Sequence, residues 1–163
     1  MIAVEGLKLN ATGATYSFRD VTATFVSPTT EFVLGRNSGV AEEGITISPV
    51  GEQNVMKRGA GGGWGHSMIA GTWATIKVAL LQTSNANSLL QTAYDLQHLN
   101  SSLWGKNQIV IRENKSGTTI ICLGCAFKNW ASFPFKMEME AIEWEFDCGR
   151  IEAIRGTYQN VTV

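Results

Sequence analysis

The chain has 163 residues, a formal net charge of −1 and 44% hydrophobic residues. A chain of this length can bury roughly 70% of the surface that it exposes when unfolded, so it needs neither disulfides nor a metal to form a core. The net charge lacks the excess of lysine and arginine that nucleic-acid-binding proteins need. The longest hydrophobic run is far short of the roughly 20 residues that span a membrane.

The first third of the chain predicts an arm followed by short strands. Residues 1–14 are small and weakly patterned, as expected for an arm that orders only against a neighbour. A loop is expected at Arg36–Gly44, and Pro49 indicates that the strand containing it lies at a sheet edge. Alternation of apolar and polar residues predicts strands at Thr15–Val26, Glu31–Gly35 and Ile45–Val50.

Residues 51–71 form the longest stretch without a strand or helix pattern. Gly59–Gly65 contains five glycines in seven residues, and glycine loses the most backbone freedom on ordering. Irregular segments longer than about 12–15 residues in compact domains are usually functional or disordered. We therefore expect a long Gly-rich loop that a partner orders.

The middle of the chain contains the clearest helix signal. A strand is predicted at Thr72–Thr83, followed by a helix at Asn85–Leu99 with Ser84 or Asn85 as its N-cap. One isolated amphipathic helix must lie on a sheet, because it cannot build a core alone. The apolar stripe expected to face that sheet consists of Leu89, Leu90, Ala93, Leu96 and Leu99.

Strands dominate the rest of the chain. They are predicted at Gln108–Glu113, Thr118–Lys128, Met137–Cys148 and Ile151–Ile154, and Thr118–Lys128 reads as a central strand because both its faces are apolar. The order of elements predicts a single mainly β domain over residues 1–163, a β-sandwich or partial barrel with one flanking helix at about 85–99. Two opposite faces are expected on Met137–Cys148. Ile142, Trp144, Phe146 and Cys148 point one way, and Glu143, Glu145 and Asp147 the other.

The motifs that suggest enzymatic chemistry are weak. Cys122 and Cys125 stand three apart on a predicted strand, so they should face opposite sides about 10 Å apart, too far for a disulfide or a shared metal. Ala60–Ser67 resembles a phosphate-binding loop, but Ala60 replaces the first glycine and His66 replaces the lysine. We therefore expect no catalytic residue, no cofactor and no metal. Three cysteines, an odd number, indicate a reducing cytoplasm and no disulfide framework.

Two surface features leave alternatives open. The acidic run that ends in Glu143, Glu145 and Asp147 is either a solvated strand face or a lining that repels DNA phosphates. Trp64 and Trp104 lie in predicted loops, where aromatic side chains serve either a sugar-binding platform or a protein–protein contact. A low charged content of 17%, against about 25% in an average protein, favours a surface that is covered in an assembly.

Several short motifs follow one another between about Thr15 and about Tyr158. They are YSFRDVTA at Tyr16–Ala23, GVAEEGITI at Gly39–Ile47, VALLQTS at Val78–Ser84, SSLWGKN at Ser101–Asn107, CAFK at Cys125–Lys128 and EWEFD at Glu143–Asp147. In their order and spacing, these motifs resemble a family of phage structural proteins, the tail tube subunits of contractile-tailed bacteriophages.

The resemblance implies hexameric rings whose inner sheets close into one barrel, and which stack into a tube that conducts DNA without sequence-specific binding. It implies a virion tail protein that is made in the bacterial host cytoplasm, takes no small-molecule substrate, and has sheath, baseplate and tail terminator proteins as partners. Lys57, Arg58, Trp64 and His66 are the expected inter-ring contacts, and Glu143, Glu145 and Asp147 the expected lumen lining. The alternatives are a tube from a phage-derived secretion or bacteriocin device, and a monomeric β-sandwich carbohydrate-binding module that uses Trp64 and Trp104.

Overall fold

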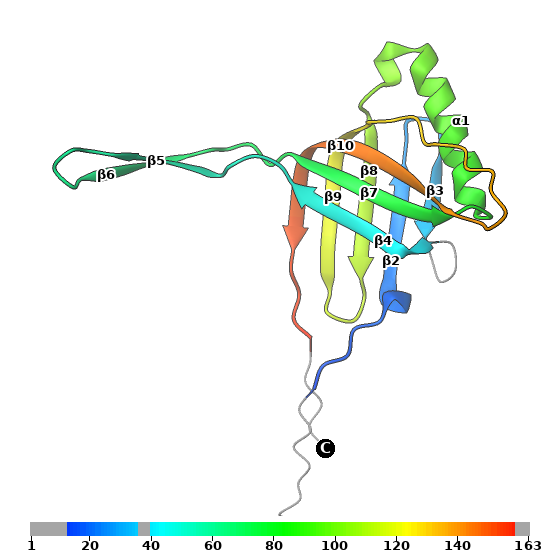
Figure 1. Ribbon diagram of the computed structural model, residues 1–163, viewed down its shortest axis with the longest axis horizontal. Coiled ribbons are helices and arrows are strands. Elements are labelled where there is room, and N and C mark those ends of the chain that lie inside the picture. The colour runs from blue at the N-terminus through cyan, green and yellow to red at the C-terminus, as the bar shows by residue number, and fades with distance from the viewer. Residues whose placement is uncertain (1–12, 36–39, 159–163) are drawn as a thin grey trace, which may run out of the picture.

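A computed structural model describes residues 13–35 and 40–158, which form mainly strands (Figure 1). Seven strands form one sheet in the order β3-β2-β8-β9-β10-β7-β4, and two further strands form a separate hairpin. The sheet strands are β2 (Val21–Val26), β3 (Glu31–Gly35), β4 (Val40–Pro49), β7 (Ala74–Leu81), β8 (Asn107–Glu113), β9 (Thr118–Phe127) and β10 (Ala141–Ile154). The mainly β fold expected from the sequence is confirmed.

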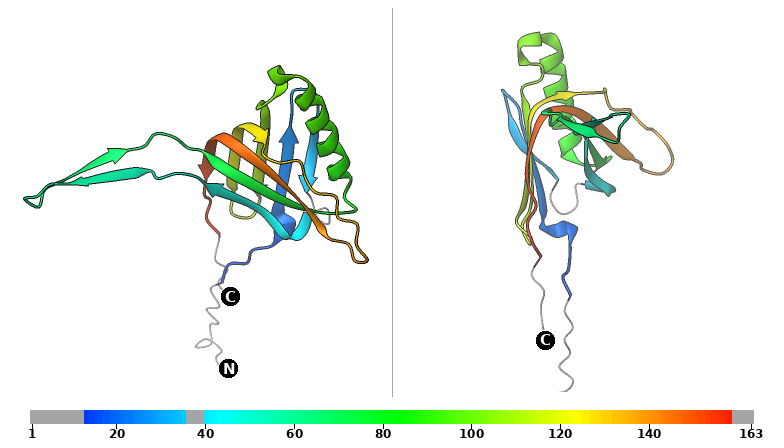
Figure 2. Two further views of the ribbon diagram at one scale, coloured as in Figure 1. Left: turned by 45° about the horizontal axis from the view of Figure 1, so that its top comes forward. Right: turned by 90° about the vertical axis from the view of Figure 1, so that its left-hand side faces the viewer.

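Strand β10 joins two differently oriented parts of the sheet. Its first part, Ala141–Cys148, pairs with β7, and its later part, Phe146–Ile154, pairs with β9. Figure 2 shows the resulting bend, which brings β4 and β7 across the face of β2, β8 and β9. The sequence predicted two strands here, but β10 is continuous through Gly149 and begins only at Ala141.

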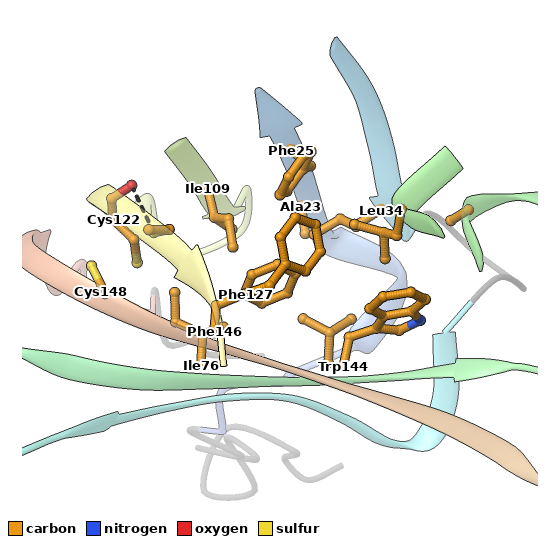
Figure 3. Close-up of a cluster of buried hydrophobic side chains, with 14 of the residues drawn as sticks. Ala23, Phe25, Leu34, Ile76, Ile109, Cys122, Phe127, Trp144, Phe146 and Cys148 are labelled. Carbon is orange, nitrogen blue, oxygen red and sulfur yellow. Dashed lines mark hydrogen bonds between the residues drawn. The ribbon is translucent and has the colours of Figure 1, made fainter. Parts of the chain in front are cut away.

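The core fills the space inside this bend. Figure 3 shows side chains of β2, β8 and β9 pointing toward those of β7 and β10. The rings of Phe25, Phe127 and Phe146 meet there, with centroids 5.0 Å apart for Phe127 and Phe146 and 5.7 Å for Phe25 and Phe146. Trp144, Phe146 and Cys148 are buried while Glu143 and Asp147 are exposed, which confirms the two faces expected for this strand.

Helix α1 (Asn85–Leu99) covers one end of the bent sheet and lies against β3 (Figure 1). Its bounds are those predicted, and the Ser84 hydroxyl caps it by accepting a hydrogen bond from the amide of Ala86. The predicted apolar stripe is wrong in part. The residues that α1 buries are Ala86, Leu90, Ala93 and Gln97, whereas Leu89, Leu96 and Leu99 are exposed.

The buried Gln97 explains this difference, because a polar partner fixes the rotation of the helix. Gln97 Nε2 donates to Asn107 Oδ1 at 2.6 Å, and Asn107 Nδ2 donates back to Gln97 Oε1 at 2.9 Å. Both amides are buried and satisfy each other, so they tie the last turn of α1 to the start of β8. Hydrophobic periodicity alone could not find a buried polar pair.

A bulge in β9 overturns the expected placement of the cysteines. Asn107 lies opposite Cys125 and Ile109 opposite Cys122, so β9 carries one residue more than β8 across this step. Gly124 takes up the extra residue at a positive φ of 63°, a conformation that favours glycine. Cys122 and Cys125 therefore share the core face, where both are buried, instead of facing opposite sides.

The third thiol, Cys148, lies directly opposite Cys125 in the β9–β10 ladder. Within the described residues, no group of three or more His, Cys, Asp or Glu side chains could hold a metal ion. Burial raises the pKa of the Cys122 thiol to about 12, and burial raises that of Cys125 further. Both groups are therefore neutral thiols at physiological pH.

We expect Cys122 and Cys125 to resist alkylation in the folded protein at pH 8, because the thiolate is the reactive form and burial disfavours it. Iodoacetamide followed by mass spectrometry should label neither residue before denaturation and both after it. Folding raises the pKa of the Cys122 thiol, so the neutral thiol contributes to the stability of the folded protein. This contribution is complete below about pH 9 and is lost as the pH rises toward 12. Rapid labelling of the native protein at pH 8 would contradict the buried placement.

The remaining differences lie near the N-terminus. Strand β2 starts at Val21, because a short 3-10 turn (Phe18–Asp20), capped by the Ser17 hydroxyl, replaces the start of the predicted strand. The predicted loop Arg36–Gly44 is shorter, because β4 already begins at Val40, and β4 is an edge strand as Pro49 indicated. Most of the predicted arm, residues 1–12, lies outside the described residues. No helix in the described parts of the chain is long and apolar enough to cross a bilayer.

Candidate assembly surfaces

A hairpin projects from the body in the segment that the sequence analysis expected to be irregular (Figures 1 and 2). Strand β5 (Asn54–Arg58) pairs antiparallel with β6 (Trp64–Met68). The glycines form the connection between them. The Gly59 amide donates to the Gly63 carbonyl at 2.7 Å, and Gly62 has a positive φ of 90°. The expectation of an irregular stretch is therefore wrong for these two strands and holds only for their connection and flanks.

The hairpin gathers the four residues expected to make inter-ring contacts. Arg58 lies opposite Trp64 and Lys57 opposite Gly65, while His66 Nδ1 lies 3.2 Å from the side-chain nitrogen of Asn54. Residues opposite each other in an antiparallel pair project to the same side, so Arg58 and Trp64 share one face of the hairpin. The Trp64 side chain is 72% exposed. No residue of β5 or β6 is buried, so none of the residues that the structure describes covers this hairpin.

Hydrogen bonds join the two segments that connect the hairpin to the sheet. The Val50 amide donates to the Trp73 carbonyl at 2.9 Å, and the Ile69 amide donates to the Gln53 carbonyl at 3.0 Å. Gln53 Nε2 also donates to the Gly71 carbonyl at 3.0 Å. The first bond continues the pairing of β4 with β7, and the other two join the segments that lead to β5 and from β6, so the two sides of the hairpin stay together at its base.

The acidic face of β10 is less negative than its sequence suggested. Glu143, Glu145 and Asp147 point away from the core, as expected. Lys77 on β7 lies opposite Glu145, with its Nζ 3.6 Å from that carboxylate and 3.9 Å from Glu143. An exposed pair of this kind contributes little to stability, but it neutralises part of the local charge. The strand register revealed this partner, which the spacing within one strand could not show.

The two tryptophans of the sugar-binding alternative lie on different elements. Trp64 is on β6 of the projecting hairpin, whereas Trp104 packs edge-on against Tyr94 and His98 at the end of α1. His98 in turn stacks on Tyr94 with ring centroids 5.4 Å apart. A sugar platform needs its aromatic rings on one surface, and these two rings have no contact in common.

A second exposed surface, which the sequence patterns did not predict, lies between β9 and β10. We call residues 128–140 the strap. Trp130 anchors its first part on α1, by donating from Nε1 to Gln91 Oε1 at 2.9 Å and stacking on Tyr94. Gln82 holds the rest, because its Nε2 donates to the Pro134 carbonyl at 2.8 Å and its Oε1 accepts from the Glu140 amide. The large apolar side chains that the strap exposes are Trp130, Phe133, Phe135, Met137 and Met139.

Comparisons with known proteins identify the kind of molecule that carries these surfaces. A family model described as Bacteriophage PhiTE tail tube protein matches residues 13–156. No curated protein matches the sequence.

The fold is similar to those of solved tube structures. The sheath–tube complex of an extracellular contractile injection system (PVC) has a chain similar to this one with a TM-score of 0.57 and 12% identity, over 86% of this chain and 92% of that one. A chain in the tail of an empty GTA particle, solved with C6 symmetry, gives a TM-score of 0.55 and 11% identity, over 88% and 100% of the two chains. A chain of the anti-feeding prophage tube-terminating cap gives a TM-score of 0.52 and 13% identity, over 88% of this chain and 95% of that one.

Proposed function

The chain belongs to the Bacteriophage PhiTE tail tube protein family, and from this premise we propose that six copies form a ring and that rings stack into the DNA-conducting tube of a contractile tail. The observation that carries the proposal is the projecting hairpin, which no other part of the described chain covers. The C6 symmetry of the similar GTA tail and the sixfold symmetry of the similar anti-feeding prophage baseplate support the number of copies.

Ring closure follows from the open edges of the sheet. Strands β3 and β4 stand at its two ends, and each has one side without a paired strand among the described residues. An open strand edge is an aggregation hazard for a monomer, and a cyclic assembly removes it by pairing edges between copies. We propose that six bent sheets joined in this way form the barrel around the lumen, and that residues 1–163 act as one tail-tube domain.

Stacking is the proposed role of the hairpin. Lys57, Arg58, Trp64 and His66 are its polar and aromatic contacts, and an exposed tryptophan beside an arginine is typical of the anchors of protein–protein interfaces. Glu143, Glu145 and Asp147 are proposed to line the lumen, where negative side chains repel DNA phosphates. Lys77 reduces this charge at Glu143 and Glu145, so the lining is weakly rather than strongly acidic.

The proposed mechanism is geometric and involves no reaction, cofactor or small-molecule substrate. The family is one of tail tube proteins, and the similar structures come from sheath–tube, baseplate and terminating-cap assemblies. We accordingly propose sheath, baseplate and tail terminator proteins as partners in the virion tail. Assembly would take place in the cytoplasm of the bacterial host.

Removal of the hairpin end should block stacking while leaving the fold unchanged. We expect deletion of residues 57–65 with an Asn-Gly closure, or Trp64→Ala, to give a normal circular dichroism spectrum and no rods in negative-stain micrographs. The physical reason is that no residue of β5 or β6 is buried by residues 13–35 and 40–158. Leu99→Ala, an equally exposed apolar position at the end of α1, serves as the control and should still form rods.

This experiment tests tube formation and the stacking role of the hairpin separately. If the wild-type protein stays monomeric by light scattering at every concentration and salt condition, it does not form a tube. If the wild type forms rods and the hairpin deletion also forms long rods, the tube stands but the hairpin does not stack the rings. Residues 1–14 would then become the better candidate for that contact.

A further inference from the structure

The hairpin and the strap lie at opposite ends of the molecule. In Figure 1 the longest axis is horizontal, with β5 and β6 at the left end and the orange loop that precedes β10 at the right, and the left view of Figure 2 gives the same arrangement. Surfaces at opposite ends cannot meet within one copy of this chain. They can meet between two copies, in a contact that joins unlike surfaces and repeats along an assembly.

Both surfaces expose large apolar side chains. On the hairpin Trp64 is 72% exposed and Met68 86%, and on the strap Phe135 is 87% exposed and Met137 fully exposed. Grouped exposed apolar side chains with polar neighbours are typical of protein–protein contacts. Hydrogen bonds to Gln82 and Gln91 hold the strap in place. Its apolar side chains are therefore presented to solvent from a fixed segment.

The charges of the two surfaces are complementary. Residues 54–68 of the hairpin contain Lys57 and Arg58 and no acidic residue. The strap itself contains two basic residues, Lys128 and Lys136, and two acidic ones, Glu138 and Glu140, and the adjoining first part of β10 adds Glu143, Glu145 and Asp147 without a basic residue. Lys136 bridges Glu140 at 2.8 Å, whereas Glu138 forms no ion pair with any residue that the structure describes.

A recess of ≈ 420 Å³ lies where the strap meets the sheet. Met139, Glu140 and Glu143 line it together with Ala79 and Ala141. Two carboxylates beside a methionine side chain suit a guanidinium group, which can bond to carboxylates while its methylene chain packs on apolar surface. Arg58 carries such a group, and it lies on the same face of the hairpin as Trp64.

We propose that the strap is the docking site for the hairpin of a second copy of this chain. Arg58 of that copy enters the recess beside Glu140, Lys57 faces Glu138, and Trp64 packs on the strap. The inference rests on the proposed tube function, and it deepens that function by assigning the surface that receives the stacking hairpin.

Charge reversal tests the assignment. The double variant Glu138→Lys/Glu140→Lys should lose rods at the concentration where the wild type assembles, and Lys57→Glu/Arg58→Glu should lose them as well. The quadruple variant that combines both pairs should regain them, because the charges are then exchanged between the two surfaces. Glu152→Lys reverses an exposed acid on the last part of β10, away from the strap, and should keep the rods. Circular dichroism checks that each variant is folded.

Each outcome decides one question. If the wild type forms rods and Glu138→Lys/Glu140→Lys does too, the strap is not the docking site although the tube function stands. If both double variants lose rods and the quadruple variant does not regain them, direct pairing of these charges is wrong. If the wild type forms no rods, the tube function fails, and the docking assignment fails with it.

Cross-linking tests the same contact without removing any contact residue. Copies with Ala60→Cys at the hairpin turn are mixed with copies carrying Ser132→Cys on the strap, and a short bismaleimide is added. A covalent dimer should form in the mixture and not in either variant alone, since the three native cysteines are buried. Ser101→Cys, exposed beyond the end of α1, replaces Ser132→Cys in the control. An equal dimer yield with the control would overturn the proposed contact.

Discussion

Replacing Phe146 by alanine is expected to lower the free energy of unfolding by about 3–5 kcal/mol, the usual cost of removing a buried aromatic side chain. Phe146 is completely buried at the centre of the core, and its ring contacts those of Phe25 and Phe127. It lies on the part of β10 that pairs with both β7 and β9. A cavity at this point weakens the packing between both parts of the bent sheet.

Urea denaturation of the unassembled protein measures the effect, with Phe135→Ala as the matched control. Phe135 is the same residue type but is 87% exposed on the strap, so its replacement should change the free energy of unfolding by less than about 0.5 kcal/mol. Domains of this size are usually stable by only about 5–15 kcal/mol, so Phe146→Ala removes a large part of the total. Equal midpoints for the two variants would contradict the assigned core.

Replacing Gln97 by leucine is expected to cost about 2–3 kcal/mol, although leucine is more hydrophobic. The substitution leaves the buried amide of Asn107 without the partner that now accepts from its Nδ2 and donates to its Oδ1. An unsatisfied buried polar group costs roughly 1–3 kcal/mol, because it gave up hydrogen bonds to water on folding.

A double-mutant cycle separates the pair from its surroundings. Gln97→Leu/Asn107→Leu removes both amides, so no buried group is left unpaired, and its cost should be lower than the sum of the two single costs by about 1 kcal/mol or more. Thermal denaturation of the wild type and three variants gives the four values. Additive costs would show that the two amides do not stabilise each other.

Sequence patterns predicted the elements whose local signals agree with their environment. The helix Asn85–Leu99 was found with its bounds because a capping serine and helical spacing act within the segment. The two faces of β10 were found because one face is buried and the other exposed over Trp144–Cys148. The contact face of α1 was only partly found, since Asn107, ten residues away in sequence, determines where Gln97 lies.

The candidate surfaces were harder to predict, for a different reason. Residues 54–68 show no alternation of buried and exposed positions, because neither face of the hairpin packs on the body. The strap has no regular period, since side chains of Gln82 and Gln91 hold it in place of a strand ladder. The Gly124 bulge changed which face Cys125 occupies, and a bulge is visible only in the register between two strands. Segments shaped by distant partners leave little local pattern in the sequence.

The placement of hairpin and strap at opposite ends has a consequence for the proposed assembly as a whole. Each hairpin-to-strap contact uses one surface of each kind, so any stack of rings keeps unused hairpins at one end and unused straps at the other. A tube built in this way is therefore polar, with two chemically different ends. A component that starts the tube and one that stops it must recognise different surfaces, one presenting carboxylates and phenyl rings, the other presenting cations and an indole.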